Sequence, residues 1–118
     1  MKRDMDLAKL ILEQVEEKSK GIGTVVLNIP DYSPDEVSYH VKILCDGGFL
    51  EATNASTMHG LDWVPKSLTW PGHEFLDAIR NDSVWKKVKE KVKEYGGKLS
   101  FAIIKNLAIK FAAEGVGL

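Results

Sequence analysis

The sequence contains a single cysteine, Cys45, so it cannot form an internal disulfide bond. Its N-terminus lacks the charged-then-apolar layout of a signal peptide. Its most apolar stretch, residues 99–118, is interrupted by two lysines, an asparagine and a glutamate, which makes it a poor membrane span. We therefore expect a reducing, cytoplasmic setting and no membrane partner.

The pattern of reactive side chains is also sparse. His40, His59 and His73 fall in three separate predicted elements, and no pair has the spacing of metal ligands. Cys45 shares a predicted helix with His40 but lies on another face, and no third group is evident to orient a nucleophile. A hydrogen-bonded, half-buried His40 is the simpler interpretation. The sequence thus predicts a non-enzymatic protein without metal or cofactor.

Charge is divided unevenly along the 118 residues, although the net charge is only −1. Residues 1–83 hold 8 Lys and Arg against 14 Asp and Glu, a net charge of −6, whereas residues 84–118 hold 8 Lys against 3 Glu, a net charge of +5. The lysines of residues 86–93 fit either a surface for phosphates or an acidic partner, or, more commonly, a solvated helix face.

The stretch from Ser33 to Leu50 predicts one complete helix and its exit. Ser33 can cap the helix, and a proline and two acidic residues follow in its first turn. Val37, Val41 and Leu44 recur at helical spacing and predict a buried stripe. Two glycines then end the helix, and the chain continues as an extended segment. This order is how a winged-helix module is built at its third helix.

The neighbouring segments predict the rest of such a module. Residues 4–18 predict a first helix, with Leu7, Leu10, Ile11 and Val15 at helical spacing. Residues 24–29 are β-branched and predict a strand, and residues 49–69 predict a β-hairpin, the wing. Thr69 is placed to cap a further helix. Three tryptophans around the wing predict a core corner rather than a base-stacking surface.

Two more helices are predicted after residue 80. The stretch Asn81-Asp82-Ser83 predicts a break and a new helix cap, and the helix that follows ends at two glycines, residues 96 and 97. A last helix, from about residue 100 to residue 114, has a wide apolar arc. We expect an α+β protein with a winged-helix domain over residues 1–80 and a C-terminal helical extension over residues 81–118. The extension is expected either to pack on the domain or to form a homodimer. Its candidate interface residues are Phe101, Ile104, Leu107 and Phe111.

Three separated blocks carry a resemblance to a known family: MKRDMDLAKLILEQVEEK, YSPDEVSYHVKILCDGGFLEA and LTWPGHEFLDAIRNDSVWKKVKEK. Together they resemble domain-of-unknown-function family 2513, a family of small bacterial and phage-borne proteins. The resemblance also extends over GGKLSFAIIKNLAIK and implies a winged-helix fold of uncharacterised activity. VSYHVKILCDGGFLEA is in addition similar to the recognition helix and following strand of winged-helix regulators.

Two functions follow as hypotheses. The first is a nucleic-acid-associated or regulatory module of bacterial or phage origin, in which Ser38, Tyr39, Lys42 and wing residue Lys66 contact double-stranded DNA. The predicted recognition helix, however, carries one lysine against three acidic residues, which opposes binding to phosphates. The alternative is a non-enzymatic module that uses the same fold to bind a protein partner.

Overall fold

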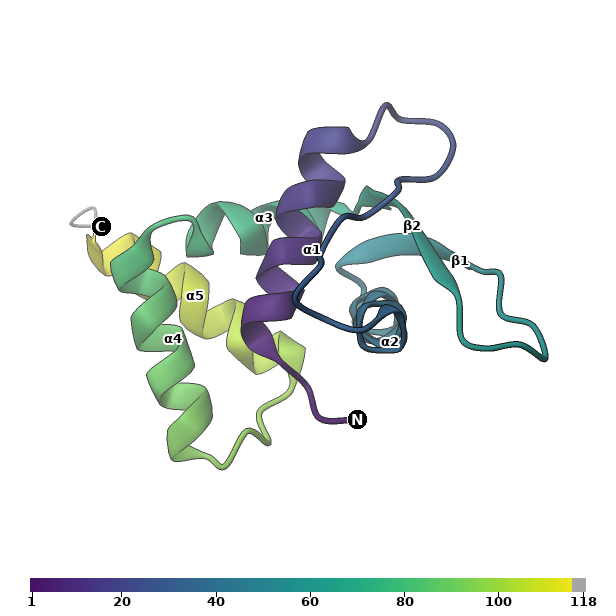
Figure 1. Cartoon of the computed structure of the whole chain (residues 1–118). Coiled ribbons are helices and arrows are strands. Elements are labelled where there is room, and N and C mark those ends of the chain that lie inside the picture. The colour runs from purple at the N-terminus through teal and green to yellow at the C-terminus, as the bar shows by residue number, and fades with distance from the viewer. Residues whose placement is uncertain (116–118) are drawn as a thin grey trace. The chain divides into compact units, whose positions relative to one another are not determined.

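The computed structural model describes residues 1–115, which form five helices and one two-stranded antiparallel sheet (Figure 1). The predicted α+β class is therefore confirmed. The chain divides into two compact units between His73 and Glu74, inside α3 (Trp70–Ile79), on the N-terminal side of the boundary predicted at residue 80. Unit 1 is the part up to His73 and unit 2 the part from Glu74.

The first helix, α1 (Met5–Lys18), has the predicted position. The Asp4 carboxylate caps it by accepting hydrogen bonds from the main-chain N–H groups of Asp6 and Leu7, at 3.0 and 3.1 Å. Leu7, Ile11 and Val15 are fully buried, as predicted. Leu10 is 40% exposed, and Leu12 is fully buried instead.

The second helix, α2 (Pro34–Asp46), is the one around which unit 1 is built. Ser33 and Glu36 form a reciprocal capping box at its N-terminus. Val41 and Leu44 are fully buried, as predicted, whereas Val37 is only half-buried. Gly48 adopts a φ of 84°, a left-handed conformation that glycine favours, and the chain passes directly into the sheet.

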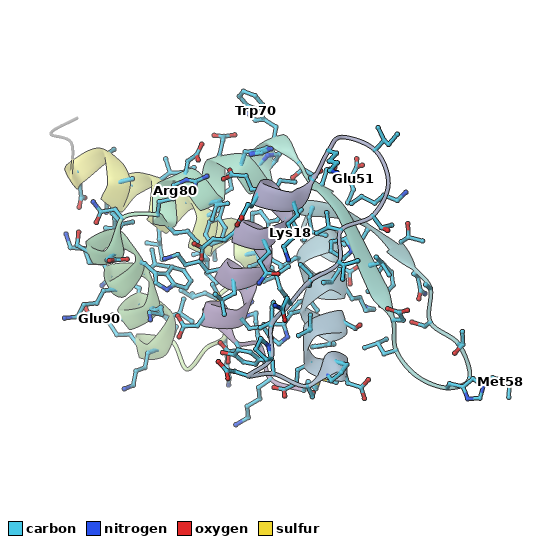
Figure 2. All side chains as sticks on the ribbon, turned by 45° about the horizontal axis from the view of Figure 1, so that its top comes forward. Lys18, Glu51, Met58, Trp70, Arg80 and Glu90 are labelled. Atoms are coloured by element: carbon cyan, nitrogen blue, oxygen red, sulfur yellow. The ribbon has the colours of Figure 1, made fainter. Side chains whose placement is uncertain are left out.

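The predicted hairpin is confirmed as β1 (Leu50–Asn54) paired with β2 (Trp63–Leu68). Main-chain hydrogen bonds between Thr57 and Gly60 close its tip, and Met58 lies fully exposed at the end (Figure 2). The register shifts between Glu51 and Ala52, so the opposite strand has an extra residue there. Pro65 lies on the outer edge of β2, where its missing N–H costs no ladder bond.

The strand predicted over residues 24–29 is wrong. This segment is extended, but only one backbone bond joins it to β2, from the Val25 N–H to the Pro65 carbonyl at 2.8 Å. The Gln14 side chain of α1 bonds both the N–H and the carbonyl of Asn28, at 2.9 and 2.8 Å, and Lys18 donates to the Val26 carbonyl. Side chains of α1 thus take the place of a strand partner.

Unit 1 ends with the first turn of α3. Thr69 caps this helix as predicted, because its hydroxyl accepts a hydrogen bond from the Gly72 N–H at 3.1 Å. The Thr69 hydroxyl also donates to the Gly48 carbonyl, and the Thr69 N–H donates to the Phe49 carbonyl. These bonds draw α3 close to the start of the hairpin. Trp70 is 78% exposed, so the predicted tryptophan core corner is wrong for this residue.

Unit 2 contains α4 (Asp82–Glu94) and α5 (Phe101–Gly115), which pack against each other. The cap predicted within residues 81–83 is Asn81, whose side-chain oxygen accepts hydrogen bonds from the N–H groups of Ser83 and Val84. The buried side of α4 matches the prediction except that Tyr95 is 61% exposed. Gly96 and Gly97 both have positive φ and end the helix, as two consecutive left-handed residues cannot continue it.

Candidate functional site

The outward face of α2 is the predicted nucleic-acid contact, but not all of the residues predicted for it are exposed there. Ser38 does not face outward: it is 8% exposed, and its hydroxyl accepts a hydrogen bond from the Trp63 N–H of β2 at 3.3 Å. This bond holds α2 against the hairpin. The expectation that Ser38 is exposed on the recognition surface is therefore wrong, because its side chain already serves a structural contact.

The other predicted contact residues remain accessible. Tyr39 and Lys42 are half-exposed on α2, and Lys66 is exposed on β2. Lys42 is paired with Asp46 at 2.9 Å, and the hydrogen bond and charge of this carboxylate raise the pKa of the Lys42 ammonium. The carbonyl of Lys66 accepts a hydrogen bond from the Ser19 hydroxyl at the end of α1. The α2 face therefore offers little uncompensated positive charge.

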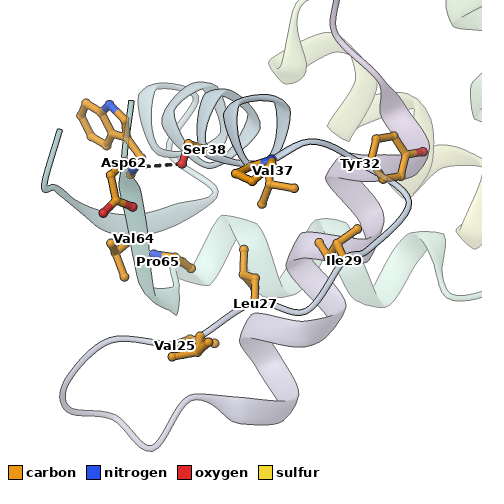
Figure 3. A pocket seen from close by; sticks show the side chains of 12 residues that line it. Val25, Leu27, Ile29, Tyr32, Val37, Ser38, Asp62, Val64 and Pro65 are labelled. Carbon is orange, nitrogen blue, oxygen red and sulfur yellow. Dashed lines mark hydrogen bonds between the residues drawn. The ribbon is translucent and has the colours of Figure 1, made fainter. Parts of the chain in front are cut away.

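A groove of about 360 Å³ lies between α2, β2 and the extended segment over residues 24–29 (Figure 3). Most of its lining side chains are apolar and only partly buried, and Leu27 and Ile29 project from the segment toward α2 and β2. Val26 is 82% exposed at its rim. We call this site the β2 groove; its walls are Val25, Val26, Leu27, Ile29, Tyr32, Pro34, Val37, Ser38, Asp62, Trp63, Val64 and Pro65.

Main-chain polar groups also face the β2 groove. The Ala55 N–H bonds the Asp62 carbonyl, so in the alternating pattern of an antiparallel pair Trp63 and Pro65 turn their main-chain groups away from β1. On the facing segment, Val26 and Asn28 bond to α1, which leaves Leu27 directed the other way. Within the described residues no hydrogen bond occupies the main chain of Leu27. On β2, the Trp63 N–H is already bonded to the Ser38 hydroxyl and the Pro65 carbonyl to the Val25 N–H. The groove thus combines apolar walls with one accessible main-chain edge, at Leu27.

The sequence analysis did not find the β2 groove. Its residues come from three segments between residues 25 and 65, and the sequence signal for residues 24–29 was interpreted as a paired strand. The sequence does not show that this β-like segment stays out of the sheet, because that depends on the hydrogen bonds from the Gln14 side chain. The exposed pair Val26 and Leu27 is the one local signal that could have indicated a surface.

The four predicted oligomer-interface residues differ in their exposure. Ile104 is fully buried, so it has no surface to offer to a second chain, and its inclusion is wrong. Phe101, Leu107 and Phe111 are half-buried. The helical period places residues 104 and 108 on the buried stripe of α5 and residues 103, 107 and 111 on a second, accessible stripe.

The histidines have structural environments. His40 is more buried than expected, at 1% exposed, and both ring nitrogens are hydrogen-bonded, to the Glu36 carbonyl and the Asp4 N–H. His59 is at the exposed hairpin tip, and His73 lies 3.5 Å from a Glu16 carboxylate oxygen. Among residues 1–115, no three His, Cys, Asp or Glu side chains are grouped to hold a metal ion. No described helix has the length and apolar character to cross a membrane.

Fold and surface together define a winged-helix-like α+β protein, in which a capped helix leads through two glycines into an exposed hairpin. The chain belongs to the family described as "Hypothetical protein (DUF2513)", whose model matches residues 2–98. It is also 38% identical, over 112 residues, to a Haemophilus influenzae protein named "Uncharacterized protein", with 92% of each chain covered. No solved structure matches the chain.

Proposed function

We propose that the protein is a non-enzymatic interaction module that binds an extended, apolar segment of a partner protein in the β2 groove. The observation that carries this proposal is the pairing of apolar, partly buried walls with the main chain of Leu27, which carries no hydrogen bond within the described residues. An extended peptide lying beside this segment would form main-chain hydrogen bonds with Leu27, and its alternate side chains would enter the groove.

The charges of unit 1 favour a protein partner over duplex DNA. Residues 1–73 hold 7 Lys and Arg against 11 Asp and Glu, a net charge of −4. The exposed side of α2 includes Asp35 and Asp46, and Lys42 is paired with Asp46. Neutralisation of phosphates supplies most of the affinity of non-specific DNA binding, so this surface would repel a duplex before reading it.

The test uses a random peptide library displayed on phage and selected against the full chain. Val26→Glu places a charge at the rim of the β2 groove, and Ile22→Glu is the matched control, since the two side chains are 82% and 85% exposed and Ile22 does not line the groove. We expect the selected peptides to be apolar and extended, and to lose about tenfold or more in affinity for the Val26→Glu variant alone.

Amide NMR spectra locate the binding. A selected peptide should shift the amide resonances of Leu27 and Trp63 and leave those of the hairpin tip unchanged. Peptides that bind both variants equally, or that shift resonances elsewhere in unit 1, would exclude the β2 groove as the site.

Double-stranded DNA is the second candidate, favoured by one contact. The hydrogen bond from the Asp4 N–H to His40 brings the chain that follows Lys2 and Arg3 against α2, so two cations precede the residue that contacts this helix. If DNA is the ligand, duplex affinity falls steeply between low and moderate salt, and Lys42→Glu and Lys66→Glu reduce it. Absence of duplex binding at low salt removes this candidate.

A further inference from the structure

Unit 2 contains a second groove, separate from the β2 groove, between α4 and α5. It has a volume of about 430 Å³. Tyr95 and Ile103, at its wall, are 61% and 49% exposed. We call it the α4–α5 groove; the residues that line it are Lys91, Tyr95, Leu99, Ile103, Leu107, Lys110 and Phe111.

The apolar side chains in this groove exceed what the packing of α5 requires. Ile104 and Ala108 are fully buried and provide the stripe that packs in the unit. Ile103, Leu107 and Phe111, spaced four residues apart, form a second stripe that stays accessible. A second apolar stripe on an already packed helix indicates a docking surface.

Positive charge surrounds this stripe. Lys91 and Lys110 line the α4–α5 groove, and the Lys87 ammonium lies 6.0 Å from the centre of the Phe111 ring. The acidic groups nearby are Glu94, which pairs with Lys91 at 3.3 Å, and Glu114, one turn after Lys110. The three lysines outnumber these two glutamates, so the surroundings of the groove stay positive, within a segment, residues 84–118, that holds 8 Lys against 3 Glu.

We propose that the α4–α5 groove binds an amphipathic helix whose apolar stripe is flanked by acidic residues. The apolar stripe of such a partner would cover Ile103 and Leu107, and its carboxylates would face Lys91 and Lys110. A second copy of this chain fits less well. A twofold pairing would bring two identical lysine-rich surfaces together, and the approach of surfaces with the same sign of charge is unfavourable.

Two synthetic helical peptides test the charge requirement with the full chain. They share one apolar stripe with a spacing of three and four residues, and they differ only in their flanking residues, Glu in one and Lys in the other. By fluorescence anisotropy, the Glu peptide should bind about tenfold or more tightly than the Lys peptide, and its affinity should fall as salt rises.

Matched variants test the site. Ile103→Glu and Lys110→Glu should each lower the affinity for the Glu peptide by about tenfold. Ile109→Glu and Lys86→Glu are the controls and should change the affinity for the Glu peptide by less than about twofold. Ile109 is 38% exposed on the same helix and Lys86 is exposed on α4, but neither residue lines the groove. Far-UV circular dichroism confirms that each variant stays folded.

Three results would overturn the proposal. Equal binding of the two peptides would show apolar adhesion without charge selection. Loss of binding in the Ile109→Glu and Lys86→Glu variants as well would place the site elsewhere. A doubled mass in light scattering that Ile103→Glu abolishes, together with no binding of the Glu peptide, would assign the groove to a second copy. The β2 groove is unaffected by any of these outcomes.

Discussion

The Nε2 atom of His40 in α2 accepts a hydrogen bond from the main-chain N–H of Asp4, at 2.8 Å, immediately before α1. A main-chain N–H can only donate, so the ring hydrogen is on Nδ1, which donates to the Glu36 carbonyl at 2.7 Å. Asp4 in turn caps α1 with its carboxylate. One buried imidazole thereby connects the start of the first helix to the first turns of the second.

Replacement of His40 should therefore destabilise unit 1. In His40→Leu the Asp4 N–H loses its acceptor inside the protein, which should lower the free energy of unfolding by about 1–3 kcal/mol. Urea denaturation followed by circular dichroism measures the change. His59→Ala, at the exposed hairpin tip, is the control and should change stability by less than about 0.5 kcal/mol. Equal stability of the two variants would contradict the structural role of His40.

The position of Gly72 has no room for a side chain. A Cβ added there would lie 1.8 Å from the main-chain oxygen of Phe49, which is fixed by the hydrogen bond from Thr69. Gly72→Ala should therefore lower the free energy of unfolding by about 3 kcal/mol or prevent folding. Gly115→Ala is the matched control, because that helical glycine has open space around it. Thermal melts of both variants give the comparison, and a melting temperature unchanged by Gly72→Ala would contradict the close approach.

Gln14 should determine the protection of the segment over residues 24–29. Gln14→Ala removes both hydrogen bonds to Asn28, so the Asn28 amide should exchange with solvent about fivefold or more faster, at a cost in global stability of about 1 kcal/mol. Hydrogen exchange followed by NMR measures this rate. Glu13→Ala, an exposed position on the same helix, should leave the rate unchanged. An unchanged rate in Gln14→Ala would mean that another group holds the segment.

Tyr32, at the edge of the β2 groove, should titrate above its ordinary value of 10.0. Burial raises the pKa of its hydroxyl, and the Asp4 carboxylate raises it further by its charge and by a hydrogen bond. The folded state then holds this proton longer than the unfolded state, so the contribution of Tyr32 is complete below pH 10.0 and is lost as pH rises through the raised pKa.

Absorbance at the tyrosinate band, with Tyr32→Phe to assign the signal, measures this titration. Asp4→Asn should move the Tyr32 pKa part of the way back toward its ordinary value, since burial remains and asparagine still caps α1. No movement in Asp4→Asn would show that the carboxylate does not act on this hydroxyl.

The sequence by itself determined the elements whose signals are local. The capping of α2 by Ser33, its exit through Gly48 and the hairpin after it depend on residues within a few positions of one another, and each was predicted. The break before α4 and its end at the paired glycines followed for the same reason, from residues 81–83 and 96–97. The winged-helix-like class could thus be inferred before any tertiary contact was known.

Only the tertiary structure decided what the surfaces are. The segment over residues 24–29 has a strand-like sequence, but Gln14, four residues before the end of α1, bonds its main chain at Asn28, and only one backbone bond joins the segment to β2. Ser38 and Ile104 belong to helices predicted correctly, yet each faces a partner that comes from another element. A side chain's neighbours depend on how distant segments pack, and periodicity within one helix carries no information about them.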